Sequence, residues 1–416
     1  MPFSPRHKPS RPTNSGTASV AALLVGEARA AAARGSFEEA LRLCDQALAD
    51  SPDDLPALTI TAELCLMRGL KEKALPLLAR ATRLQPDHGG LQYMYGVALF
   101  QMDRTQTAVR ALERATSLQP ENGQAWSALG ASHQKLGHLL AALNAYEQAT
   151  ALEPGDADIW VNRSAAALRL KDWSGAEQAT ARALDISPGH RRALTYQAIA
   201  LTELGRRSDA ASILDFDSLM RRVDLAGQMP ADELDNLNKA LVAHIEARPD
   251  LTYEPILKAT KGGSQTQNLL AGPAGPVARL EAEVRRAVET YIADADPARH
   301  PYLAFAPRKW RLIMWGTLLR RQGRQAPHIH PGAWLSGVYY AALPPEMTTA
   351  DSDAGWIEFG RPGDEFPCEQ EPVTRMIEPR EGSLLLFPSY MFHRTIPFDS
   401  DHPRVSIAFD IEPVNQ

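Results

Sequence analysis

Two patterns of hydrophobic positions follow one another along the 416-residue chain. Segments such as 231–248 and 275–294 place apolar residues three and four positions apart, which predicts amphipathic helices. From Trp310 onward the pattern consists of short runs of alternating β-branched, aromatic and aliphatic residues, separated by Pro, Gly and Asp. These predicted strands are 311–320, 335–343, 355–359, 382–390 and 404–412. Because no helical crossovers lie between them, the pattern favours an antiparallel barrel or sandwich over a parallel Rossmann-type sheet.

The N-terminal half carries a repeat of 34 residues. Its prolines are Pro52, Pro86, Pro120, Pro154 and Pro188, and its alanines are Ala40, Ala74, Ala108, Ala142, Ala176 and Ala210. This period resembles the tetratricopeptide repeat, in which small residues let two antiparallel helices approach closely and the proline ends the second helix. About six units fit between Ala21 and Asp217, which predicts an all-α solenoid over 21–217. The preceding residues 1–20 are rich in Pro, Ser and Arg, and we expect a disordered tail there.

A stack of such repeats usually presents a concave face to an extended peptide or a partner helix. We therefore expect the repeat region to recruit a protein or peptide, although a spacer or dimerisation device would have the same sequence pattern. Neither the bound sequence nor the oligomeric state is indicated by any residue pattern.

The composition indicates which binding partners and which cellular compartment to expect. The formal net charge of -6, with 44% hydrophobic and 23% charged residues, gives no electrostatic reason to expect nucleic-acid binding. The three cysteines, Cys44, Cys65 and Cys368, show no CxxC spacing, which argues against a disulfide framework and fits a reducing cytoplasm. No run approaches the roughly 18 apolar residues of a membrane span, and the first residues lack a signal-peptide core.

Candidate chemistry is concentrated in the last predicted strands. His328 and His330 are two residues apart, so their side chains point to the same side of a strand. His393 follows an apolar strand, and Arg404 and Ser406 again share one strand face. The spacing is that of a hairpin, in which a turn around 397–403 would return Arg404 alongside His393. This hairpin would place a guanidinium fork beside a possible metal centre.

The order of these residues resembles the iron(II)- and 2-oxoglutarate-dependent oxygenases. The barrel of that family carries His-x-Asp/Glu, a distal His and then an Arg or Lys. The pair Tyr339-Tyr340 is similar to a strand of the prolyl hydroxylase group, and Arg404-x-Ser406 is similar to the cosubstrate-binding Arg-x-Ser. The segments HIHPG, LSGVYY and GSLLLFPSY resemble a bacterial subgroup of uncharacterised oxygenases. The resemblance covers roughly the last hundred residues.

This resemblance implies an α+β domain over 218–416 with a double-stranded β-helix, or jelly-roll, core. It implies Fe(II) held by His328, His330 and His393, 2-oxoglutarate held by Arg404, Ser406 and Tyr340, and dioxygen as the oxidant. The implied activity is a dioxygenase that hydroxylates a protein or peptide side chain recruited by the repeats. Prolyl 3-hydroxylases have a similar architecture.

The chain departs from the family pattern at His330, which replaces the usual acidic residue. One interpretation is a three-histidine iron centre, since neutral imidazoles also support iron(II). In another, His328 and His393 bind the metal with water or an anion, while His330 orients a ligand. A degenerate, non-catalytic barrel on a repeat scaffold and a cupin-like dioxygenase without 2-oxoglutarate are further alternatives. Glu358 and Asp353 could replace the missing carboxylate, but a solvated strand edge or loop explains each at least as well.

Overall fold

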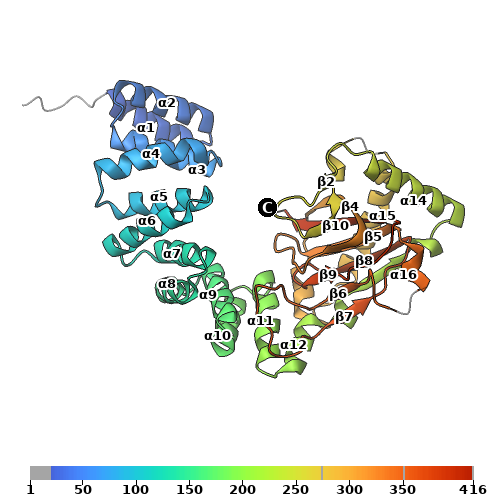
Figure 1. The fold of residues 1–416 in the computed structure, drawn as a ribbon. Coiled ribbons are helices and arrows are strands. Elements are labelled where there is room, and N and C mark those ends of the chain that lie inside the picture. The colour runs from blue at the N-terminus through green and yellow to red at the C-terminus, as the bar shows by residue number, and fades with distance from the viewer. Residues whose placement is uncertain (1–19, 273–274, 350–351, 415–416) are drawn as a thin grey trace, which may run out of the picture. The chain divides into compact units, whose positions relative to one another are not determined.

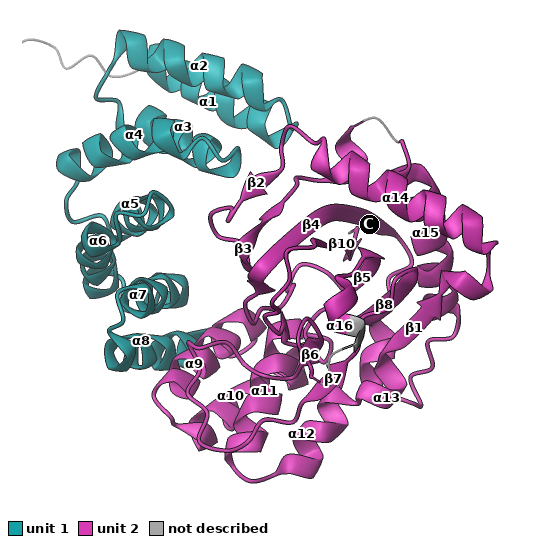
Figure 2. Ribbon diagram, turned by 45° about the vertical axis from the view of Figure 1, so that its right-hand side comes forward, with its two compact units in different colours: residues 1–153 teal, residues 154–416 magenta. Residues whose placement is uncertain are grey.

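The computed structural model describes residues 20–272, 275–349 and 352–414. The chain contains two compact units, residues 1–153 and residues 154–416, which are coloured separately in Figure 2. The tail predicted for residues 1–20 lies outside the described residues, apart from Val20, which begins the first helix. Among the described residues, no helix combines the length and the apolar character that crossing a membrane requires.

Unit 1 is built from pairs of antiparallel helices, as the 34-residue period predicts (Figure 1). Its helices are α1 (Val20–Ala33), α2 (Phe37–Asp50), α3 (Leu55–Met67), α4 (Lys71–Leu84), α5 (Gly89–Gln101), α6 (Thr105–Leu118), α7 (Gly123–Lys135) and α8 (Leu139–Leu152). The repeated alanines Ala40, Ala74 and Ala108 are fully buried, which permits close helix approach.

The turn inside each repeat uses a left-handed backbone conformation. Gly35, Gly69 and Gly137 have φ between +72° and +78°, which glycine adopts without steric cost. Asp103 occupies the equivalent turn with φ 61°, a conformation that a side chain makes less favourable. These glycines, which are 34 or 68 residues apart, therefore mark the turn between the two helices of a repeat.

Unit 2 begins with two further helix pairs and continues into the β-rich part. Its helices are α9 (Ala157–Arg169), α10 (Trp173–Ile186), α11 (Arg191–Glu203), α12 (Arg207–Leu214), α13 (Phe216–Leu219), α14 (Ala231–Glu246), α15 (Val277–Ala293) and α16 (Pro345–Thr349). Helices α14 and α15 confirm the two amphipathic helices predicted from apolar spacing.

The strands form two antiparallel sheets. They are β1 (Arg221–Asp224), β2 (Thr252–Tyr253), β3 (Thr260–Gln265), β4 (Trp310–Gln325), β5 (Leu335–Ala342), β6 (Ile357–Phe359), β7 (Arg375–Ile377), β8 (Ser383–Pro388), β9 (His393–Thr395) and β10 (Arg404–Pro413). The larger sheet has the order β1-β8-β5-β10-β4-β3-β2, and the smaller one β7-β6-β9. A cavity lined by both sheets lies between them, which is the core expected of a double-stranded β-helix.

Helix α14 covers the face of the larger sheet that points away from this cavity (Figure 1). Tyr339 of β5 donates a hydrogen bond to Asn238 of α14. Ile245 of the same helix lies so close to Gly316 of β4 that an added Cβ would be 2.9 Å from it. Because side chains alternate along a strand, burying Tyr339 on this face turns its neighbour Tyr340 toward the cavity.

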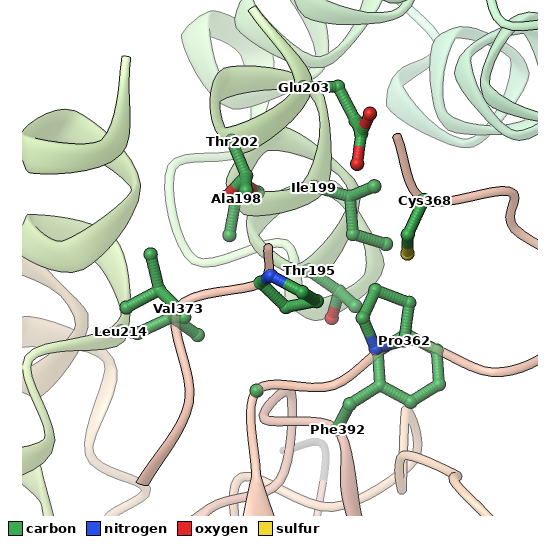
Figure 3. A pocket seen from close by; sticks show the side chains of 12 residues that line it. Thr195, Ala198, Ile199, Thr202, Glu203, Leu214, Pro362, Cys368, Val373 and Phe392 are labelled. Carbon is green, nitrogen blue, oxygen red and sulfur yellow. The ribbon is translucent and has the colours of Figure 1, made fainter. Parts of the chain in front are cut away.

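Helix α11 packs against the irregular segment 360–373, which follows β6. The two enclose an apolar pocket whose walls include Ile199, Pro362 and Phe392 (Figure 3). At its edge the Glu203 carboxylate accepts hydrogen bonds from the backbone N–H groups of Glu369 and Gln370, at 2.9 and 3.2 Å. The last helix pair is thus attached to the β-rich part by specific polar contacts as well as by apolar packing.

Candidate metal centre

Three histidines meet at one end of the cavity. His328 and His393 exchange two backbone hydrogen bonds of 3.1 Å, and the backbone N–H of His330 donates to Ser389 at 3.0 Å. Their available ring nitrogens all lie within 4.8 Å of one another, and among the described residues this is the group of side chains able to hold a metal ion. The structure therefore brings together the three histidines that the sequence analysis singled out.

Each histidine uses Nδ1 for a hydrogen bond to a neighbouring acceptor. Nδ1 of His328 lies 2.7 Å from the carbonyl oxygen of Ala326, and Nδ1 of His393 lies 3.0 Å from that of Met391. A carbonyl only accepts, so both rings carry their proton on Nδ1 and leave the Nε2 lone pair available. Transition metals bind neutral imidazole through such a nitrogen.

Burial keeps two of the imidazoles neutral. Desolvation, reinforced by the neighbouring histidine His330, lowers the pKa of His328 to about 3. The same cause lowers the pKa of the fully buried His393 well below its usual value. Because a metal competes with protons for imidazole nitrogen, these shifts prepare the site for a cation at neutral pH.

The depressed histidine pKa values predict an acid-sensitive metal-free barrel. As the pH falls below 6.5, the unfolded chain protonates both histidines well before the folded chain does, because their pKa values are lowered in the folded state. Stability therefore falls as the pH decreases through this range. Between pH 7.5 and 5.5, the two histidines together should lower the free energy of unfolding by up to about 3 kcal/mol. Hydrogen exchange of peptides covering β10 measures this loss in the metal-free protein. A His328→Gln/His393→Gln variant should lose much less, and an identical pH dependence in both proteins would contradict the assignment.

The third histidine is held by a carboxylate that the sequence analysis did not single out. Nδ1 of His330 lies 2.8 Å from Oδ2 of Asp410, and Ser336 donates a hydrogen bond of 2.6 Å to Oδ1. Asp410 is 80 residues from His330 and lies on β10. The sequence does contain one indication of this role. Asp410 follows Arg404, Ser406 and Ala408 at alternate positions of one strand, and such residues share a face.

Arg404 lies in the same cavity as the histidines and is 2% exposed. Its Nη1 donates to Ser406 at 3.3 Å, and its guanidinium carbon lies 5.1 Å from the centre of the Tyr340 ring. Within the described chain, Nε of Arg404 and the Tyr340 hydroxyl are buried without a hydrogen-bond partner. Burial lowers the pKa of Arg404 and raises that of Tyr340. A buried cation beside an unpartnered hydroxyl is the donor set that a small carboxylate would satisfy.

The hairpin predicted for His393 and Arg404 is wrong, and neither Glu358 nor Asp353 joins the histidines. His393 and Arg404 do not form a hairpin, because β9 pairs with β6, whereas β10 pairs with β4 and β5. They line the same cavity from opposite sheets instead. The carboxylate of Glu358 is buried between the guanidinium groups of Arg361 and Arg394, and Asp353 is exposed in a loop. Neither belongs to the histidine cluster.

The cavity adjoins a wide cleft at the surface. The two share Trp315, Gln325, His328 and His330 as lining residues. The Trp315 ring stacks on His330, with 5.6 Å between ring centroids and 21° between the planes. The fully exposed Leu257 lies at the cleft, on a turn where its φ is 62°. A substrate entering through this cleft would reach the histidines directly.

Comparison with known proteins agrees with this geometry. Residues 313–410 match the family described as "Putative 2OG-Fe(II) oxygenase". Residues 31–88, 72–132 and 127–191 match tetratricopeptide-repeat families. The oxygenase family implies iron and 2-oxoglutarate, and the matched span includes all three histidines as well as Arg404. No curated protein sequence matches the chain.

Several solved repeat proteins are similar to this chain. YrrB, described as a TPR protein with an unusual peptide-binding site, is 24% identical, with a TM-score of 0.38; the match covers 41% of this chain and 88% of YrrB. MamA from Desulfovibrio magneticus RS-1 is 20% identical, with a TM-score of 0.39, over 42% of this chain and 98% of MamA. PilF of Pseudomonas aeruginosa is 18% identical, with a TM-score of 0.42, over 47% of this chain and 90% of PilF.

The histidine cluster, the buried arginine and these family matches lead to one conclusion. The chain joins tetratricopeptide repeats to a C-terminal domain of the family described as "Putative 2OG-Fe(II) oxygenase".

Proposed function

We propose that the protein is an iron(II)- and 2-oxoglutarate-dependent dioxygenase that hydroxylates a protein or peptide side chain. One observation carries the proposal. Three histidines, each with a ring nitrogen within 4.8 Å of those of the other two, share a buried cavity with Arg404, which lies beside Tyr340. Within the described residues, Nε of Arg404 and the hydroxyl of Tyr340 have no hydrogen-bond partner. A metal would bind to the histidines, and a carboxylate would bind to the arginine and the tyrosine.

His328, His330 and His393 would hold the metal through Nε2, since Nδ1 of each ring already has an acceptor. Iron(II) with 2-oxoglutarate supplies the activation of dioxygen for oxidation of a C–H bond. Neutral imidazoles favour binding of a divalent cation at neutral pH, because no proton has to leave His328 or His393 first. The surrounding apolar side chains, such as Ile357 and Phe387, exclude water from the centre.

Arg404 would bind the distal carboxylate of 2-oxoglutarate. Its guanidinium is buried without a carboxylate in any contact recorded for the described residues, so an incoming anion would gain charge-assisted hydrogen bonds in a site of low dielectric. The Tyr340 hydroxyl would donate to the same anion, and Ser406 would hold the guanidinium in place from its own strand. These contacts would fix which end of the cosubstrate faces the metal.

A polypeptide substrate is favoured by the form of the cleft and by the repeats. The cleft is lined by polar residues such as Gln267 and Asn268 and by the exposed Leu257, which suit an extended chain with alternating polar and apolar groups. Tetratricopeptide repeats commonly bind peptides, so a substrate recruited by that part of the chain fits the fusion.

Neither of the two alternative functions requires Arg404. A non-catalytic scaffold would gain nothing from a buried, incompletely bonded guanidinium, which costs free energy in the absence of an anion. A three-histidine dioxygenase without 2-oxoglutarate would not need that guanidinium either. Arg404 is thus the residue that favours the 2-oxoglutarate-dependent reaction.

The proposal is tested by anaerobic titration of the iron(II)-loaded protein with 2-oxoglutarate. Chelation of the metal by the 2-oxo acid should produce a weak visible charge-transfer band that saturates at one equivalent. The zinc-loaded protein is the matched control, because zinc has no accessible d-electron for such a transition and should give no band. Tight iron binding without any band would instead favour the cupin-like alternative, and absence of iron binding would favour the scaffold.

A further inference from the structure

We propose that Asp410 is the positioning carboxylate of this metal centre: it fixes the His330 ring with Nε2 toward the metal and supplies the negative charge that the His-x-His sequence lacks. The inference rests on the proposed function, because it concerns the same iron site. The observation that carries it is the chain of hydrogen bonds from Ser336 through Asp410 to His330.

The strand pairing places Asp410 behind His330. Asp410 pairs with Ser336 of β5 on one side and with Ile313 of β4 on the other, so its backbone is fixed in the middle of the larger sheet. The side chains of His330 and Asp410 are only 16% and 12% exposed. A carboxylate in this position is held by two strands rather than by a mobile loop, which gives it the rigidity that a supporting residue needs.

Both oxygens of the Asp410 carboxylate accept a hydrogen bond, each from a different residue. Ser336 donates to Oδ1 at 2.6 Å, which leaves Oδ2 as the acceptor for His330 at 2.8 Å. An ionised carboxylate only accepts, so the proton of His330 lies on Nδ1 and the Nε2 lone pair is left available to a metal. The Trp315 ring is stacked on the imidazole of His330 and limits its rotation about the Cβ–Cγ bond.

Asp410 also distinguishes His330 from the other two histidines. His328 and His393 are oriented by neutral backbone carbonyls, whereas His330 alone is oriented by a carboxylate. A carboxylate makes the imidazole a stronger donor to a metal than a carbonyl does. The negative charge that a His-x-Asp/Glu sequence would bring into direct contact with iron is here one imidazole farther away. This arrangement accounts for the replacement of the acidic residue by His330.

Cobalt(II)-loaded full-length protein offers a readout that is independent of activity. Each histidine bound through Nε2 carries an exchangeable Nδ1 proton, which cobalt(II) shifts far from the normal proton NMR range. Wild type should show one such signal for each of the three histidines in water and none in deuterium oxide. Asp410→Ala should lose the signal of His330 through fast exchange. Asp410→Asn, which can still accept through its amide oxygen, should retain the signal at an altered shift.

Chelator competition measures the consequence for affinity. Asp410→Ala should bind iron(II) about 10- to 100-fold more weakly than wild type, with Asp410→Asn between the two. Glu412→Gln is the matched control, since Glu412 lies two residues farther along β10 and pairs with Arg311. It should leave both the signals and the affinity unchanged. Circular dichroism checks that each variant is folded.

The outcomes separate this inference from the proposed function. If Asp410→Ala keeps all three exchangeable signals and the wild-type affinity, the role of Asp410 is refuted while the iron site stands. If wild type binds neither cobalt(II) nor iron(II), both the inference and the proposed function fail. If Asp410→Ala is unfolded, Asp410→Asn alone decides: an unchanged chemical shift and affinity overturn the inference, and an altered shift with weaker binding supports it.

Discussion

Arg404→Met should reduce the affinity for 2-oxoglutarate by about 10²- to 10⁴-fold while leaving iron(II) binding unchanged. The range corresponds to the loss of two charge-assisted hydrogen bonds to the distal carboxylate. Metal affinity should persist because, within the described residues, Arg404 interacts with Ser406 and Tyr340 and forms no hydrogen bond with the histidines. Isothermal titration calorimetry under anaerobic conditions gives both constants. Wild-type 2-oxoglutarate affinity in this variant would exclude Arg404 as the carboxylate-binding residue.

The same substitution should stabilise the barrel when no cosubstrate is present. Arg404 is buried with Nε unpaired in the described structure, so replacing it with an apolar side chain of similar length removes a desolvated charge. We expect a gain of about 1 kcal/mol, measured by hydrogen exchange of β10 peptides. Arg394→Met is the matched control with the opposite sign, since Arg394 pairs with the buried carboxylate of Glu358. A loss of stability in Arg404→Met would mean that its contacts with Ser406 and Tyr340 outweigh the cost of burial.

His393→Ala should weaken iron(II) binding on the order of 100-fold or more, because it removes a metal ligand from the centre of the cluster. The effect is measured anaerobically with a competing chelator. His402→Ala is the matched control, since His402 lies in the turn before β10 with its side chain 66% exposed. Equal iron affinities for the two variants would contradict the metal site.

A parallel His330→Ala variant separates the two arrangements left open by the sequence. If His330 is a ligand, its removal should weaken binding as strongly as removal of His393. If it only orients another ligand, the loss should stay within about 10- to 100-fold. The ratio of the two affinities therefore distinguishes the three-histidine centre from the two-histidine centre.

Much of the fold followed from periodicity alone. A 34-residue repeat of Pro and Ala defines helix pairs because each small residue has one place in the unit. The structure confirms these pairs and shows left-handed turns at Gly35, Gly69 and Gly137. The antiparallel sheets followed from alternating runs without helical crossovers. His328 and His330 could be placed on one side because their spacing of two is local to the chain.

Long-range strand pairing could not be obtained in the same way. The proximity of Asp410 and His330 depends on the register between β10 and β5, which no short pattern encodes. The hairpin predicted for His393 and Arg404 failed for a related reason. A turn of suitable length does not fix the sheet to which the next strand belongs, and here β8, β9 and β10 alternate between the two sheets.

The contacts made by α11 have a consequence for how such a protein can change in evolution. Helices α9 to α12 belong to the same compact unit as the sheets, and Glu203 binds two backbone amides of the segment 360–373. Loss of these helices would expose an apolar surface that includes Pro362 and Phe392 (Figure 3). We therefore expect gain or loss of repeats to be tolerated upstream of residue 154, and helices α9 to α12 to be kept together with the barrel.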